Sequence, residues 1–132
     1  MPSIVNFSDA ASIGIHGMVL LARHREPLNA IELSKRLGKS KHHIGKVMQR
    51  LVKTGYLDSF RGPTGGFKLR KNPEEITMYE IYSAIEGKVE IRDCQSDNPI
   101  CPVNKCIFNN VVKILSIDFV NYMQNEHLSE YI

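Results

Sequence analysis

The chain contains three cysteines, and all of them lie in the thirteen-residue stretch CQSDNPICPVNKC, which runs from Cys94 to Cys106. Their spacing is Cys-x6-Cys-x4-Cys, and most of the residues between them are Asp, Asn, Ser and Pro, which favour turns at the protein surface. Three thiolates in one surface loop can bind a single metal centre, because thiolates are the ligands of iron–sulfur clusters and common ligands of zinc. This stretch is therefore predicted to form the reactive site of the protein.

The residues alone leave four interpretations of the three thiols open. An iron–sulfur cluster fits best, because it needs thiolates and accepts another residue type at the fourth position. A thiol–disulfide switch would use two of the three cysteines and leave one over. Structural zinc usually has four protein ligands in paired Cys-x2-4-Cys spacings, which this stretch lacks. Inert buried thiols fit poorly, since the polar, turn-forming composition predicts a surface loop.

The length and composition of the chain indicate the cellular compartment in which these thiols occur. The 132 residues suit one domain with a modest core, and they include no run of eighteen apolar residues and no N-terminal signal pattern. We therefore expect a cytoplasmic protein, in a compartment where structural disulfides are rare and clustered cysteines more often bind metal or respond to redox.

The net charge of +3 is unevenly distributed along the chain. Residues 1–72 contain 13 Lys and Arg against 4 Asp and Glu, whereas residues 73–132 contain 4 against 10. A basic front half joined to an acidic back half predicts that the front half binds a polyanion, although surface charge can also drift along a sequence by chance.

Helix signals in the basic half are typical of a helix-turn-helix. Residues 8–23 are predicted to form a first helix capped by Ser8. Asn29 opens a short second helix that Gly38 ends, and Ser40 caps a third. The third helix has one apolar stripe (Ile44, Val47, Met48 and Leu51) and one polar, basic face. Two helices joined by so tight a turn predict that the third is a DNA recognition helix.

A predicted β-hairpin follows the third helix directly. Residues 56–61 and 67–71 are β-prone, and the glycine-rich segment 62–66 between them suits a hairpin loop. A hairpin in this position is a wing that contacts the DNA backbone or minor groove. The predicted DNA-binding residues of helix and wing are Ser40, Lys41, His42, His43, Lys46, Arg50, Arg61, Gly65, Gly66 and Lys68.

Gly45 lies in the middle of the predicted recognition helix, where Gly costs about 1 kcal/mol relative to Ala. Close approach of the helix to DNA would explain it, and so would a packing constraint or simple tolerance. The sequence does not choose between these explanations.

The back half is predicted to contain two further helices. One spans residues 77–86, and the other runs from Ile107 to about residue 124 with an unusually broad apolar face. Packing of that face against a second copy of the chain in a homodimer is expected, the alternative being an ordinary core helix.

The fold class expected from these elements is mainly α with a small β wing. The predicted domains are a winged helix-turn-helix domain at 1–87, a cysteine loop for cluster binding at 88–106, and a dimerisation helix with the C-terminal tail at 107–132.

The stretch GYLDSFRGPTGGFKLRKNPEEITMYEIYSAIEG, together with the three-cysteine loop, resembles the Rrf-two family of bacterial winged-helix regulators. The resemblance extends from Phe7 to about Leu128. It implies a homodimer joined through the C-terminal helices, with two helix-turn-helix units on double-stranded operator DNA. It also implies that the cysteine loop (Cys94, Cys101 and Cys106) holds an iron–sulfur cluster that controls DNA affinity.

Within the family, NFSDAASIGIHGMVLLA and SKHHIGKVMQRLVKTGYL are similar to the nitric-oxide-sensing NsrR subfamily. That similarity implies a four-iron cluster whose fourth ligand is Asp9 of the other subunit, whereas from the residues alone Asp9 is a first-turn helix charge. Asn109 stands where the IscR subfamily has a histidine ligand, and the cysteine spacing also departs from the family pattern. A two-iron cluster is the alternative.

The expected function is therefore a DNA-binding transcriptional regulator, a repressor, whose cluster senses nitric oxide or redox and iron status. A cluster-free winged-helix regulator with a thiol switch is the first alternative, and an iron–sulfur redox protein is the second. The sequence has no nucleotide-binding Gly loop after a strand and no paired catalytic carboxylates, so we expect no enzyme activity.

Overall fold

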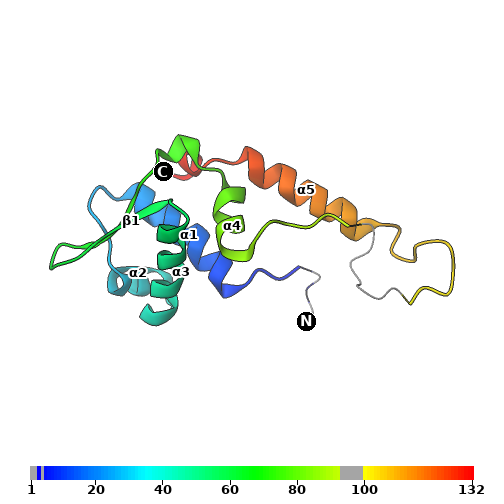
Figure 1. Ribbon diagram of the computed structural model, residues 1–132, viewed down its shortest axis with the longest axis horizontal. Coiled ribbons are helices and arrows are strands. Elements are labelled where there is room, and N and C mark those ends of the chain that lie inside the picture. The colour runs from blue at the N-terminus through cyan, green and yellow to red at the C-terminus, as the bar shows by residue number, and fades with distance from the viewer. Residues whose placement is uncertain (1–2, 4, 93–99) are drawn as a thin grey trace.

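The computed structural model describes residue 3 and residues 5–92 and 100–132, so Cys94 lies outside the described part of the chain. Helices dominate it, with one two-stranded antiparallel sheet (Figure 1). The α-helices and strands are α1 (Asp9–Arg23), α2 (Ala30–Leu37), α3 (Lys41–Lys53), β1 (Leu57–Phe60), β2 (Gly66–Leu69), α4 (Met78–Glu86) and α5 (Val111–Asn125). Short 3-10 helices η1 (Pro73–Glu75) and η2 (Leu128–Tyr131) complete the fold. This arrangement confirms the predicted fold class.

Each of the first four α-helices begins at a polar cap that satisfies a free backbone N–H group. Ser8 accepts a hydrogen bond from the N–H of residue 11 at 3.0 Å, and Asn29 accepts one from residue 32 at 2.8 Å. Ser40 accepts from residue 43 at 3.2 Å, and Thr77 from residue 80 at 3.1 Å. Gly38 ends α2 in the left-handed conformation, with φ of 68°. The local signals therefore place the helix-turn-helix where the sequence predicts it.

The core lies where α1, α3 and α4 meet. The predicted stripe of α3 is buried there in full, together with apolar residues of α1, α2, α4 and the wing. Gly14 and Gly17 of α1 allow this close packing: a Cβ on Gly14 would lie 1.9 Å from Cδ1 of Ile85, and one on Gly17 would lie 2.8 Å from Cε of Met48. The recognition helix is thus fixed to a rigid base.

The wing is a short hairpin attached at its base to the segment before α2. The register pairs Leu57 with Leu69 and Phe60 with Gly66, so the strands are shorter than predicted and Gly66 belongs to β2 rather than to the loop. The N–H of Phe67 donates to the carbonyl oxygen of Leu28 at 2.8 Å. Because this bond and its reciprocal tie the wing to the helix-turn-helix, the two predicted DNA-binding elements hold a fixed orientation.

The fifth α-helix projects from this base, with the segment 100–110 at its outer end (Figure 1). It begins at Val111 and not at Ile107 as predicted, because Asn109 and Asn110 take left-handed φ values of 52° and 55° that interrupt the helical pattern. Met123 is the buried residue of α5. No helix in the described residues is long and apolar enough to cross a membrane.

The inner end of α5 is held by rings and by backbone pairing. Phe119 packs against Tyr82 of α4, with ring centroids 5.1 Å apart, and against Phe7, with centroids 5.7 Å apart. After α5, the N–H of Leu128 donates to the carbonyl of Ile76 at 2.9 Å. The chain thus returns to the base of α4. At the outer end of α5, the apolar side chains of Val111, Ile114 and Leu115 stay exposed in the described part of the chain.

Candidate DNA interface and cysteine loop

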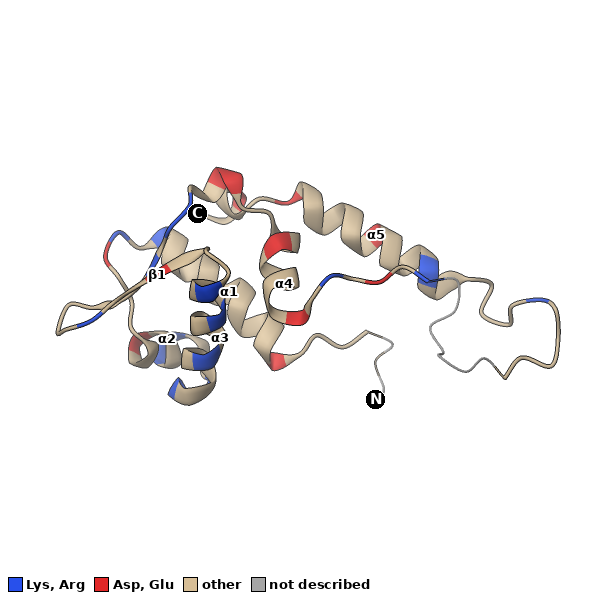
Figure 2. Ribbon diagram, viewed as in Figure 1, with Lys and Arg blue, Asp and Glu red and all other residues tan. Residues whose placement is uncertain are grey.

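The polar face of α3 is exposed and strongly basic. Figure 2 shows several positive charges along α3 and the wing, while most of the negative charges lie outside these two elements. Most of the predicted helix contacts (Ser40, Lys41, His42, Lys46 and Arg50) are exposed, and His43 is half-buried. A basic helix face beside a basic hairpin is suited to neutralise phosphates and reach base edges.

An open hollow of about 530 Å³ runs along this face. Its lining residues are Lys41, His42, Gly45, Lys46, Gln49, Arg50 and Lys53. The sequence pattern places Gln49 and Lys53 on this polar face as well, although they were not among the predicted DNA contacts.

Arg50 has a structural partner that the sequence did not reveal. Its Nη1 donates a hydrogen bond of 2.7 Å to the carbonyl oxygen of Ile85, in the last turn of α4. A cation at a helix C-terminus satisfies a free carbonyl and interacts favourably with the helix dipole. Arg50 therefore connects the recognition helix to α4, and its contact with DNA stays a prediction.

The wing residues divide into two groups. Arg61 and Lys68 are exposed and free to meet phosphate. Gly65 and Gly66 have conformational reasons to be glycine: a Cβ on Gly65 would lie 2.3 Å from the carbonyl oxygen of Phe60, and Gly66 has φ of 143° with the backbone of Leu28 2.5 Å from where its Cβ would be. These contacts explain both glycines without DNA, so their predicted DNA binding stays untested.

Two of the three cysteines lie in the described part of the chain. Cys101 is exposed, and Cys106 is half-buried just before α5. The N–H of Asn110 donates to Sγ of Cys106 at 3.5 Å. The backbone N–H groups of Asn110 and then Phe108 lower the pKa of the Cys106 thiol from its usual value, more than desolvation raises it. Cys106 is thus inclined toward the thiolate, the form that binds metal and reacts with oxidants.

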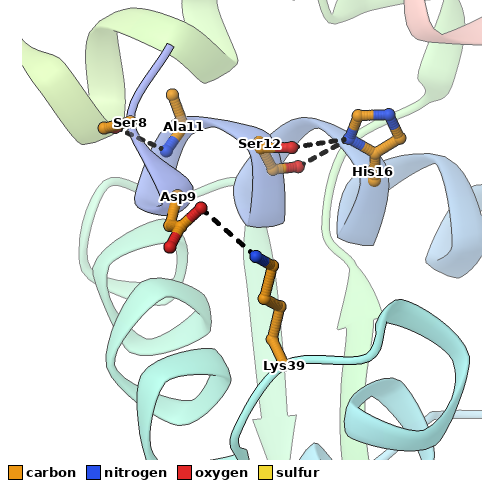
Figure 3. Close-up of polar contacts among 6 residues, drawn as sticks. All are labelled: Ser8, Asp9, Ala11, Ser12, His16 and Lys39. Carbon is orange, nitrogen blue, oxygen red and sulfur yellow. Dashed lines mark hydrogen bonds and ion pairs between the residues drawn. The ribbon is translucent and has the colours of Figure 1, made fainter. Parts of the chain in front are cut away.

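Asp9 lies in the first turn of α1 and is paired with the turn of the helix-turn-helix. Its Oδ1 is 3.2 Å from Nζ of Lys39, and the Asp9 side chain is 67% exposed (Figure 3). Within residues 3, 5–92 and 100–132, no three metal-binding side chains come together in a single chain. Ligation of a cluster by Asp9 of the other subunit stays a prediction that the resemblance implies.

Comparison with protein families identifies one match over almost the whole chain. The family model for Rrf2, described as an iron-dependent transcriptional regulator, matches residues 7–132. A curated relative, the HTH-type transcriptional regulator IscR of Pectobacterium atrosepticum, is 28% identical over 120 residues, which cover 89% of this chain and 73% of the relative.

Solved structures share the fold at lower identity. The structure of T. potens IscR superposes with a TM-score of 0.75 and 20% identity, and covers 96% of this chain and 85% of that one. CymR, the global cysteine regulator of B. subtilis, superposes with a TM-score of 0.73 and 20% identity, and covers 96% of this chain and 95% of that one.

Proposed function

This chain belongs to the Rrf2 family of transcriptional regulators, and we propose that it is a homodimeric repressor whose affinity for operator DNA is controlled by an iron–sulfur cluster. Its place among DNA-binding regulators agrees with the expectation that it is not an enzyme. The observation that carries the DNA-binding function is the exposed basic face of α3 beside a basic wing, both fixed to one core.

DNA recognition is assigned to α3 and the wing. The polar face of α3 enters the major groove, where His42 and Lys46 reach base edges and phosphates, and Arg61 and Lys68 of the wing meet the flanking backbone. Two copies of α3 in a dimer would contact two half-sites about one helical turn apart.

Dimerisation is assigned to α5. Its outer part exposes apolar side chains, among them Val111 at 44%, Ile114 at 52% and Leu115 at 42%. Exposed apolar surface of this kind on a projecting helix is stabilised when a second copy covers it.

The cluster is assigned to Cys94, Cys101 and Cys106, with Asp9 of the other subunit as fourth ligand. The donor chemistry fits, because Cys106 is held toward the thiolate and Cys101 is accessible. When bound, a four-iron or two-iron cluster supplies iron that reacts with nitric oxide and oxygen. The segment that carries the cysteines joins α4 to α5. A change in its conformation would change the orientation of the winged helix-turn-helix domain (residues 1–87) relative to α5. The spacing of the two α3 helices on the DNA half-sites would change with it.

The first test is the visible spectrum with iron and sulfide analysis of protein purified without oxygen, before and after stoichiometric nitric oxide. The proposal expects a coloured protein whose iron content is lost in Cys101→Ala and Cys106→Ala. A colourless wild-type protein that takes up no iron or sulfide on reconstitution would remove the cluster from the proposal.

The role of Asp9 is separable from its ion pair. Asp9→Asn should lower the iron content or change the spectrum if the carboxylate is a ligand. Lys39→Ala breaks the same ion pair and leaves the carboxylate in place, so it is the matched control and should retain the wild-type spectrum. A wild-type spectrum and iron content in both variants would leave Asp9 as a first-turn helix charge alone.

A regulator with a thiol switch is the second candidate, because the lowered pKa of Cys106 also favours oxidation. It predicts colourless protein whose DNA affinity changes with peroxide and is restored by a dithiol reductant.

A further inference from the structure

Gly45 lies at the centre of the face that α3 presents to solvent. Apart from Pro, Gly is the least favourable residue in a helix interior, so a glycine in the middle of a thirteen-residue helix needs an explanation. The helix does not require it for its shape, because Gly45 is not among the residues with positive φ.

Packing within the chain does not explain Gly45. The two buried glycines of α1 show what a packing glycine looks like, since a Cβ on either would collide with Ile85 or Met48. A Cβ on Gly45 would meet no other side chain or segment of the described residues within 4 Å. The fold therefore has room for a side chain at position 45 and lacks one.

The missing side chain contributes to the hollow on the basic face. Gly45 lines that hollow together with Lys41 and His42 on the preceding turn, the adjacent Lys46, and Gln49 on the following turn. Cationic and amide side chains thus surround a patch of bare helix backbone, whose N–H and C=O groups are already used inside the helix.

We propose that Gly45 is a DNA-contact residue whose lack of a side chain lets α3 lie against the base edges of the major groove, with the methyl group of a thymine in the hollow. This inference rests on the proposed DNA-binding function and goes beyond it by assigning a base. The 5-methyl of thymine is the apolar group on the major-groove edge, and it needs no hydrogen bond from the helix backbone. Gln49, on the next turn, is of the type that pairs with adenine at its N6 and N7 atoms.

The proposal predicts opposite effects of Gly45→Ala on folding and on binding. The variant should be more stable, with a Tm about 3 °C higher, because Ala is the better helix former and meets open space. Its affinity for DNA should fall at least about tenfold, because the methyl group holds the helix away from the bases. The salt dependence of binding should not change, since no charge is altered.

The probe is a DNA duplex that the wild-type protein selects from a random-sequence library. The duplex is then resynthesised several times, each time with uracil in place of thymine at one symmetric pair of positions. Removing the contacted methyl should weaken wild-type binding about fourfold per half-site, as expected for one buried methyl group. Gly45→Ala should show no such effect at the same position. His42→Ala, whose side chain borders the same hollow, is the control for a general loss of contacts and should keep the uracil effect.

The outcomes separate this inference from the proposed function. If wild-type protein selects no duplex, the DNA-binding function itself fails. If the wild type binds and Gly45→Ala binds equally well, or is less stable, the assignment of Gly45 is overturned while the function stands. Weaker binding of Gly45→Ala without a uracil effect at any position would overturn the thymine contact.

Discussion

The winged unit up to residue 87 and the segment from residue 88 onward differ in how much of their apolar surface they bury within one chain. Sixteen of the eighteen buried apolar residues in the described part of the chain lie in the winged unit, and Met123 and Leu128 are the other two. The segment 100–115 exposes Ile100, Val103, Ile107, Phe108 and most of the apolar residues that begin α5. The first region buries most of its large apolar side chains within the chain, and the second leaves most of its own exposed in the described residues.

This difference shows that apolar patterning alone does not separate a helix that packs into the core of its own chain from one whose apolar side chains stay exposed. The buried stripe of α3 and the exposed stripe of α5 both recur at helical spacing. What separates them is whether other elements of the same chain reach the stripe. Around α3 the first, second and fourth helices do, whereas in the described residues α5 packs on the core at Phe119 and Met123.

The largest effect is expected from a charge placed on the exposed stripe. Leu115→Glu should weaken the dimer at least about 1,000-fold, because an unpaired carboxylate buried in an apolar interface costs several kcal/mol. Sedimentation velocity at micromolar concentration measures the change, and DNA affinity should fall with it. Gln124→Glu adds the same charge to an exposed position of the same helix and should remain dimeric. A dimeric Leu115→Glu variant would place the interface elsewhere.

A matched pair of truncations compares the two regions directly. Leu51→Ala in α3 removes a fully buried side chain and should cost about 2–5 kcal/mol in the free energy of unfolding. Leu115→Ala should cost well under that at concentrations where the protein is monomeric. Urea unfolding followed by circular dichroism checks both values, and equal losses in dilute protein would show that α5 is part of the monomer core.

A smaller effect is expected on the basic face. Lys46→Ala should weaken DNA binding about tenfold and reduce the slope of log affinity against log salt by about two, one phosphate for each subunit. Fluorescence anisotropy at several salt concentrations measures both quantities. Lys88→Ala, the control, removes an exposed lysine outside α3 and the wing. If it lowered DNA affinity and the salt slope as much as Lys46→Ala does, the effect of Lys46 would come from net charge alone.

The parts of the fold that could be predicted from the sequence depend on interactions between residues that are close together in the chain. Ser8, Asn29, Ser40 and Thr77 each cap a helix through an N–H group three residues away, so the local pattern contains the whole interaction. The start of α5 was predicted too early, because the apolar spacing continues through a turn that the backbone of Asn109 and Asn110 breaks.

The parts of the site that could not be predicted depend on contacts between distant residues. Arg50 meets the carbonyl of Ile85, which is 35 residues away, and Asp9 meets Lys39, which is 30 residues away. From the sequence, Arg50 was predicted to contact DNA, and Asp9 to be a first-turn helix charge or a cluster ligand. Only the packing of the folded chain brings their partners within reach. The openness around Gly45 is likewise a property of the assembled fold.

The most direct test of cluster-controlled DNA binding is one anisotropy titration, carried out without oxygen, of the selected duplex with iron-loaded protein before and after stoichiometric nitric oxide. Loss of the cluster should change the affinity for the duplex at least about tenfold, which corresponds to a coupling free energy of about 1.4 kcal/mol or more. The same change should be absent in Cys106→Ala. Identical affinity of the iron-loaded and treated wild-type protein would contradict control by a cluster.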